Sequence, residues 1–116
     1  MVNKALKKVF KKVKDACFYL SDSKIMFMWA STDGIPNDKI FIGRRGMNIP
    51  DYKLTPYDIG QIDYTKPTLF KPGILTVVGA DGEAIVSYPF KDKANIKQAI
   101  KFNKCLVLYK QYKLGK

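Results

Sequence analysis

Thiols, carboxylates and lysines are the reactive side chains to consider in this chain, because its 116 residues include no histidine. Without imidazole there is no Ser-His or Cys-His nucleophile and no His-ligated metal. The cysteines Cys17 and Cys105 both fall on apolar stripes, which predicts buried, inert thiols in a reducing compartment, with a disulfide between them as the alternative. Two thiols alone do not make a structural zinc site.

Most carboxylates outside the two ends of the chain fall in expected turns, where aspartate serves the backbone. None are spaced as the opposed pair of a glycosidase or the convergent set of a magnesium nuclease. The glycine-bounded segments 43–46 and 79–82 lack the Gly-Lys-Ser/Thr ending of a phosphate loop. We therefore expect no enzyme, no catalytic residue, no metal and no cofactor.

The positive charge is concentrated at the two ends. The formal net charge is +11; residues 1–24 hold seven lysines against two aspartates, and residues 91–116 hold eight lysines against one aspartate. The centre is nearly neutral. Only Arg44 and Arg45 are arginines, and arginine is the usual reader of guanine, so sequence-specific recognition of DNA is disfavoured. Attraction to an acidic protein, a nucleic acid or anionic lipid stays open, as does plain solubilising charge.

Residues 1–22 are predicted to form a basic amphipathic helix. Apolar residues between Val2 and Leu20 recur every three or four positions, and Ser21 to Ser23 end the pattern. This helix either docks on the domain through its stripe or binds a membrane surface or partner groove. Its opposite face carries the first candidate binding residues, Lys4, Lys7, Lys8, Lys11 and Lys12.

Short antiparallel strands are expected between residues 24 and 90. The run from Ile25 to Ala30 is apolar and short, which is typical of a buried strand, and segments 38–43, 47–54 and 59–64 follow it. The strongest hairpin signal is Asp81-Gly82, between strands expected over 73–78 and 83–90.

The helical period returns at the end of the chain and predicts a helix over about 93–112, with Asp92 or Asn95 as its cap. Its lysines Lys97, Lys101 and Lys104, with Arg44 and Arg45, complete the candidate electrostatic surface. Tyr109 and Tyr112 interleave with lysines and could stack on the bases of a single strand or, equally, pack against the domain.

Four motifs follow one another over segment 39–102: KIFIGRRG at 39–46, Leu54 through the isoleucines Ile59 and Ile62, KPGIL at 71–75 before a glycine hairpin, and YPFKDK at 88–93. With these motifs the segment resembles the bacterial pleckstrin-homology-like domains. The resemblance implies an α+β fold: a strongly bent antiparallel sheet or partly open β-barrel over residues 23–116, capped by the C-terminal helix, with the N-terminal helix as an addition.

Members of this family are binding modules for phosphoinositides, peptides or proteins. Lipid-binding members carry a Lys-x-Arg cluster around the first hairpin, whereas the hairpin at 24–42 offers Asp33 and Asp38 with only Lys39. That lipid motif is not reproduced, and Arg44 with Arg45 is the nearest substitute.

We therefore expect a non-enzymatic accessory or regulatory module that binds an acidic partner protein through lysine-rich helices. The alternatives are a nucleic-acid-binding protein without sequence specificity and a peripheral binder of anionic membrane. The longest apolar run has six residues, too few for a membrane span, and no secretory signal is apparent, so a cytoplasmic protein is expected.

Overall fold

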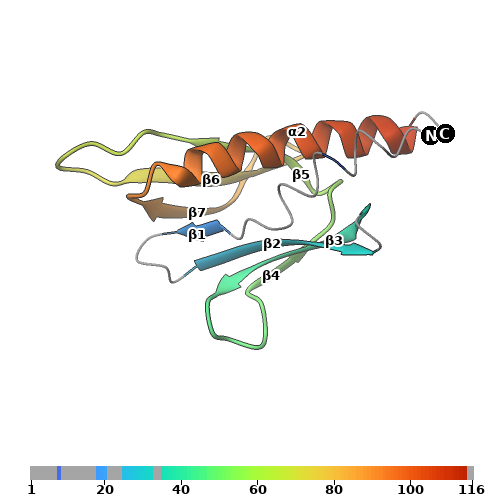
Figure 1. Ribbon diagram of the computed structural model, residues 1–116, viewed down its shortest axis with the longest axis horizontal. Helices are drawn as coiled ribbons and strands as arrows, with labels where there is room; N and C mark the ends of the chain where they lie inside the picture. Colours follow the sequence, from blue (N-terminus) through green and yellow to red (C-terminus); the bar gives the residue numbers. More distant parts are fainter. Residues whose placement is uncertain (1–7, 9–17, 21–24, 33–34, 115–116) are drawn as a thin grey trace.

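The protein has an α+β fold in the computed structural model, which describes residues 8, 18–20, 25–32 and 35–114. Figure 1 shows its strands on one side of a long C-terminal helix, α2. The strands are β1 (Phe18–Leu20), β2 (Ile25–Thr32), β3 (Ile35–Arg44), β4 (Tyr52–Leu54), β5 (Ile59–Tyr64), β6 (Gly73–Gly79) and β7 (Ala84–Phe90), and α2 spans Ala94–Leu114.

Two antiparallel sheets form, with strand orders β1-β2-β3-β4 and β5-β6-β7. In the first, Met28 pairs with Phe41 and Met26 with Gly43, so alternate residues of β2 and β3 share one face. In the second, Asp81 and Gly82 lie in the β6–β7 turn, where the Gly82 amide donates to the Gly79 carbonyl at 3.0 Å and Gly82 has a φ of 86°. The hairpin prediction is confirmed.

The core lies between the inner faces of the sheets and α2, and aromatic rings form much of it. Phe102 of α2 meets Phe27 edge-on at 4.7 Å between ring centroids and contacts Trp29 at 5.1 Å. Tyr109, two turns along the helix, stacks on Trp29 at 5.5 Å. These rings join α2 to the four-stranded sheet.

Side-chain hydrogen bonds to the backbone of β5 join α2 to the three-stranded sheet. The Ile62 amide donates to Asn103 Oδ1 at 2.8 Å, and Asn103 Nδ2 donates back to the Ile62 carbonyl at 3.0 Å. The Asn103 side chain thus takes the position of a missing neighbouring strand at this point of β5. Two turns farther along α2, Lys110 Nζ donates to the Ile59 carbonyl at 2.7 Å.

The start of α2 follows the sequence prediction. Asp92 Oδ1 accepts the Ala94 amide at 2.9 Å, which supplies one of the orphan donors of the first turn. The other candidate cap, Asn95, is the second residue of α2 and is buried.

Two predicted elements differ from the structure. Phe18–Leu20, expected to end the N-terminal helix, instead form β1, which pairs with β2 so that Leu20 lies opposite Ile25. The edge of β2 offers hydrogen-bond partners to the backbone of these residues, and the spacing of apolar residues along the chain cannot reveal such a partner. The strand expected over 47–54 is shortened to β4, since residues before Tyr52 form a loop. Of the other residues in the predicted N-terminal helix, the structure describes only Lys8, which is exposed.

Candidate functional site

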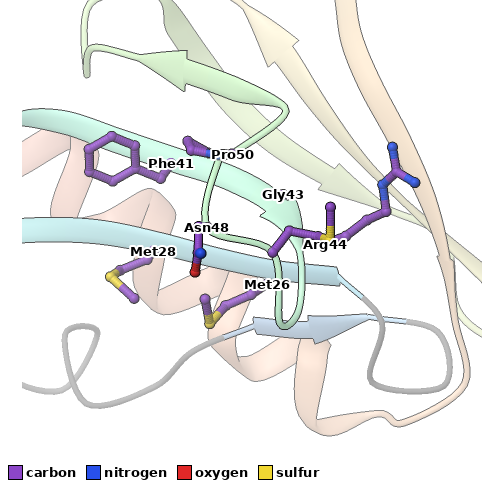
Figure 2. A pocket seen from close by; sticks show the side chains of 8 residues that line it. Met26, Met28, Phe41, Gly43, Arg44, Asn48 and Pro50 are labelled. Atoms are coloured by element: carbon purple, nitrogen blue, oxygen red, sulfur yellow. The ribbon is translucent and has the colours of Figure 1, made fainter.

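An apolar groove lies on the outer face of the four-stranded sheet. Strand alternation buries Phe27 and Trp29 in the core and turns Met26 and Met28 outward, where they meet Phe41 of β3 (Figure 2). We call this feature the methionine groove; it is lined by Met26, Met28, Phe41, Gly43, Arg44, Met47, Asn48 and Pro50.

The loop between β3 and β4 builds one wall of the groove by crossing over Gly43. A Cβ at Gly43 would lie 3.0 Å from the Pro50 Cα and 3.1 Å from the Asp51 amide nitrogen, so glycine allows the loop to pass this close to the strand without displacing its backbone. The turn into the loop is held by the Met47 amide, which donates to the Arg44 carbonyl at 3.2 Å, and Gly46 has a φ of 88°.

The groove is small and mostly apolar. Its volume is about 260 Å³, just below the range of about 300–1,000 Å³ typical of small-molecule sites. Methionine side chains are flexible and polarizable, and they adapt to varied apolar partners. The lining contains no carboxylate, thiol or hydroxyl group, so these residues provide contact surface and not acid–base or nucleophilic chemistry.

Arg44 supplies positive charge at the rim. Its side chain is 67% exposed and lies 3.6 Å from Asp51, a long ion pair at a wet surface that holds the guanidinium only weakly. Arg45 is exposed in the adjoining turn, and Lys53, opposite Phe41 in the sheet register, is exposed on β4. Cationic groups therefore flank an apolar floor.

The lysines predicted on the C-terminal helix lie on a second surface. Lys97, Lys101 and Lys104 are exposed, none has an ion-pair partner among the described residues, and α2 carries no acidic residue. Ile100 and Val107 lie on the same exposed side of the helix, where they line a shallow apolar depression. The structure thus separates these lysines from Arg44 and Arg45, which belong to the methionine groove.

The stacking role considered for Tyr109 is wrong. Its ring is 1% exposed, packs on Trp29 and donates its hydroxyl to Asp38. The pKa of this hydroxyl is raised above its ordinary value, mainly because the group is buried and secondly because it donates a hydrogen bond to Asp38. The three-residue spacing from Tyr112 could not reveal which side of the helix meets the core; the Tyr112 side chain lies outside the described residues, as do Lys4, Lys7, Lys11 and Lys12.

The prediction of a buried, unpaired thiol is confirmed for Cys105. This residue is a free cysteine buried in the core, and burial raises its pKa from 9.0 to about 12. Cys17 lies outside the described residues. In the part of the chain that the structure describes, no three cysteine or acidic side chains are grouped as metal ligands.

Sequence reasoning missed the methionines of the groove. The run from Ile25 to Ala30 predicts a buried strand, but Met26 is half-buried and Met28 is exposed. The sequence signal was the uninterrupted apolar run itself. In a sheet that is covered on one face only, every second residue of such a run must point outward and form an exposed apolar patch. A second signal was Gly43 followed closely by Pro50, which allows a loop to cross a strand.

Comparisons of the chain with protein-family models, curated proteins and solved structures find no match. Among the described residues, no helix combines the length and apolar character needed to cross a bilayer.

Proposed function

We propose that this chain is a non-enzymatic binding module of pleckstrin-homology-like architecture, and that its methionine groove binds an acidic, partly apolar segment of a partner protein. Sheets of four and three antiparallel strands followed by a C-terminal helix are consistent with that architecture. The proposal rests on the groove itself and would stand if the family resemblance were dropped.

The observation that carries the proposal is the closure of the β3–β4 loop over Gly43. An exposed apolar strand face is an aggregation hazard unless it is covered or used. Here the loop narrows the face to a groove without filling it, which leaves Met28 39% exposed. A partner side chain entering the groove would bury apolar surface on three sides.

The charges favour an acidic ligand. Arg44 lines the groove, Arg45 follows it in the adjoining turn, and Lys53 pairs with the lining residue Phe41; the whole chain carries a formal charge of +11. Surplus positive charge raises the rate of encounter with acidic partners, while the apolar contacts determine how long the complex lasts. The lysines of α2 contribute to this long-range attraction from a separate surface.

The nucleic-acid alternative has lost one of its two candidate stacking residues, because Tyr109 is buried, whereas the Tyr112 side chain lies outside the described residues. Salt dependence separates the two functions. Binding through six or more phosphate contacts would weaken by about 10³ between low and moderate salt, whereas a complex held mainly by apolar contacts in the groove would weaken far less.

The test is to select ligands from a random peptide display library on the immobilised full chain and to measure affinities by fluorescence anisotropy. We expect enrichment of peptides with large apolar residues next to Asp or Glu. Met28→Gln should weaken binding by about tenfold, because a partly buried apolar contact is lost.

Arg44→Glu should weaken binding by a similar factor, and a peptide with its acidic residue changed to lysine should recover affinity for this variant alone. Val107→Gln on α2 is the matched control, since it removes an exposed apolar side chain outside the groove. Selection of basic peptides, or equal binding by Met28→Gln and wild type, would exclude the groove as the site.

A further inference from the structure

The loop between β5 and β6 presents the most exposed apolar side chains among the described residues. Leu69 is 90% exposed and Phe70 is 91% exposed. They are adjacent in sequence and belong to neither the core nor the methionine groove. Figure 1 shows this loop extending past the first turn of α2 at one end of the molecule.

Hydrogen bonds hold these two residues at the tip of a closed turn. The Thr68 amide donates to the Lys71 carbonyl at 2.8 Å, and the Lys71 amide donates to Thr68 Oγ1 at 3.0 Å. Leu69 and Phe70 are the central residues of this turn, so their side chains project outward. The exposure is therefore a property of a defined turn.

The base of the loop is equally well determined. The Thr65 amide donates to the Ile74 carbonyl at 2.8 Å, and the Ile74 amide donates to Thr65 Oγ1 at 2.8 Å. A Cβ at Gly73 would lie 2.4 Å from the Thr65 carbonyl oxygen and 2.7 Å from Phe90 Cζ, so the loop leaves the sheet through a tight junction. Loop and sheet can therefore move as one body.

Exposed lysines lie beside the apolar tip and near the base of its loop. Lys66 and Lys71 flank the tip and are exposed. Phe90 pairs with Gly73, which brings the exposed Lys91 and Lys93 after β7 to the same end of the sheet, with Asp92 as the acidic residue between them. Asp92 is engaged in capping α2.

We propose that the tip of the β5–β6 loop docks the protein on an anionic phospholipid bilayer, with Leu69 and Phe70 entering the boundary between headgroups and acyl chains. An apolar tip flanked by Lys66 and Lys71, with Lys91 and Lys93 near the base of its loop, matches such a surface, because the lysines meet anionic headgroups while the apolar side chains leave water. A protein pocket would take the same side chains but would not require cations on both sides of them.

The experiment measures co-sedimentation of the full chain with phosphatidylcholine vesicles, with and without phosphatidylserine. Wild type should bind the serine-containing vesicles in preference. Leu69→Gln with Phe70→Gln should lower that partitioning by about 100-fold, because two apolar side chains no longer leave water. Lys66→Gln with Lys71→Gln should lower it by about 30-fold.

Ile49→Gln with Val107→Gln is the matched control, because it removes two exposed apolar side chains, 77% and 55% exposed, that belong to neither the tip nor the methionine groove. This control should bind vesicles as wild type does. The tip variants should keep the wild-type melting temperature, since their side chains make no core contact. Wild-type binding by the Leu69/Phe70 variant, or an equal loss in the control, would overturn the proposal.

A spectroscopic readout places the tip directly. Phe70→Trp should show a blue-shifted emission on serine-containing vesicles and quenching by brominated acyl chains, while the native Trp29, 3% exposed, should not change. Ile49→Trp should show neither effect. Absence of the shift in Phe70→Trp would overturn the proposal, as would sedimentation showing that the tip instead joins two copies of the chain.

Discussion

Replacing Asn103 tests how the helix is held on the three-stranded sheet. β5 pairs with β6 on one side only, and on the other side the Ile62 amide and carbonyl point to α2, where the Asn103 side chain serves both. Ile62 is 1% exposed, so neither backbone group can turn to water if that side chain is removed.

The magnitude follows from the two bonds. Each contributes about 1 kcal/mol net, and the backbone groups left unsatisfied add desolvation, for a gross loss of about 3 kcal/mol in Asn103→Ala. Alanine is the better helix former and offsets about 0.6 kcal/mol, which leaves a net loss of about 2 to 3 kcal/mol. In a chain of this length the melting temperature should fall by about 10 °C.

The assay is urea unfolding followed by the fluorescence of Trp29, the single tryptophan, which lies in the core. Lys104→Ala, one residue along and exposed, is the control and should lie within about 0.5 kcal/mol of wild type. Asn103→Asp keeps an acceptor for the Ile62 amide but loses the donor, so it should fall between the two at neutral pH. An Asn103→Ala variant as stable as the control would refute the reasoning.

Three further predictions concern the groove, the core thiol and the N-terminal segment. Gly43→Ala should displace the backbone at Pro50 and Asp51, change the shape of the groove and weaken binding of the selected peptides. Gly46→Ala, where φ is 88° and the space is open, should cost about 1 kcal/mol of stability and leave binding intact. Equal binding by both variants would contradict the role of Gly43. The free energy of unfolding should fall as pH rises from 9 toward 12, because burial raises the folded-state pKa of Cys105 to about 12 and the unfolded chain loses that proton first. In Cys105→Ala this fall in the free energy of unfolding should be smaller by about 1.4 kcal/mol at about pH 10. If urea titrations gave wild type and Cys105→Ala the same dependence on alkaline pH, the thiol would be ruled out as the cause. Phe10→Asp should destabilise the fold by several kcal/mol if residues 1–22 dock on the domain, and unchanged thermal melting would reject docking.

Local sequence signals predicted most of the strands. Ile59 to Tyr64 form β5 as expected, and the Asp58 carboxylate accepts the Thr55 amide at 2.8 Å in the turn expected before it. Such turns depend on residues a few positions apart, so they can be inferred without knowing what the strands face. The end of the predicted N-terminal helix was wrong for the opposite reason, because β1 forms only by pairing with β2 and its own sequence does not reveal that partner.

The candidate site was only partly predictable. Arg44 was singled out for its charge, but nothing in its neighbourhood along the chain indicated that β2, more than ten residues earlier, would supply the groove floor. Similarly, Leu69 and Phe70 stand between lysines and prolines in a segment that was expected to be a loop, and only the folded turn reveals their exposure.

The sequence by itself determined the chemical repertoire and the local conformations: the absence of histidine, the lysine-rich ends, the Asp-Gly hairpin and the capped C-terminal helix. The tertiary structure alone decided which face of an apolar strand meets solvent, whether Tyr109 stacks on a ligand or on Trp29, and which backbone groups Asn103 completes. The physical reason is that composition, turns and caps depend on a residue and its near neighbours, whereas burial depends on which surfaces of distant elements come together.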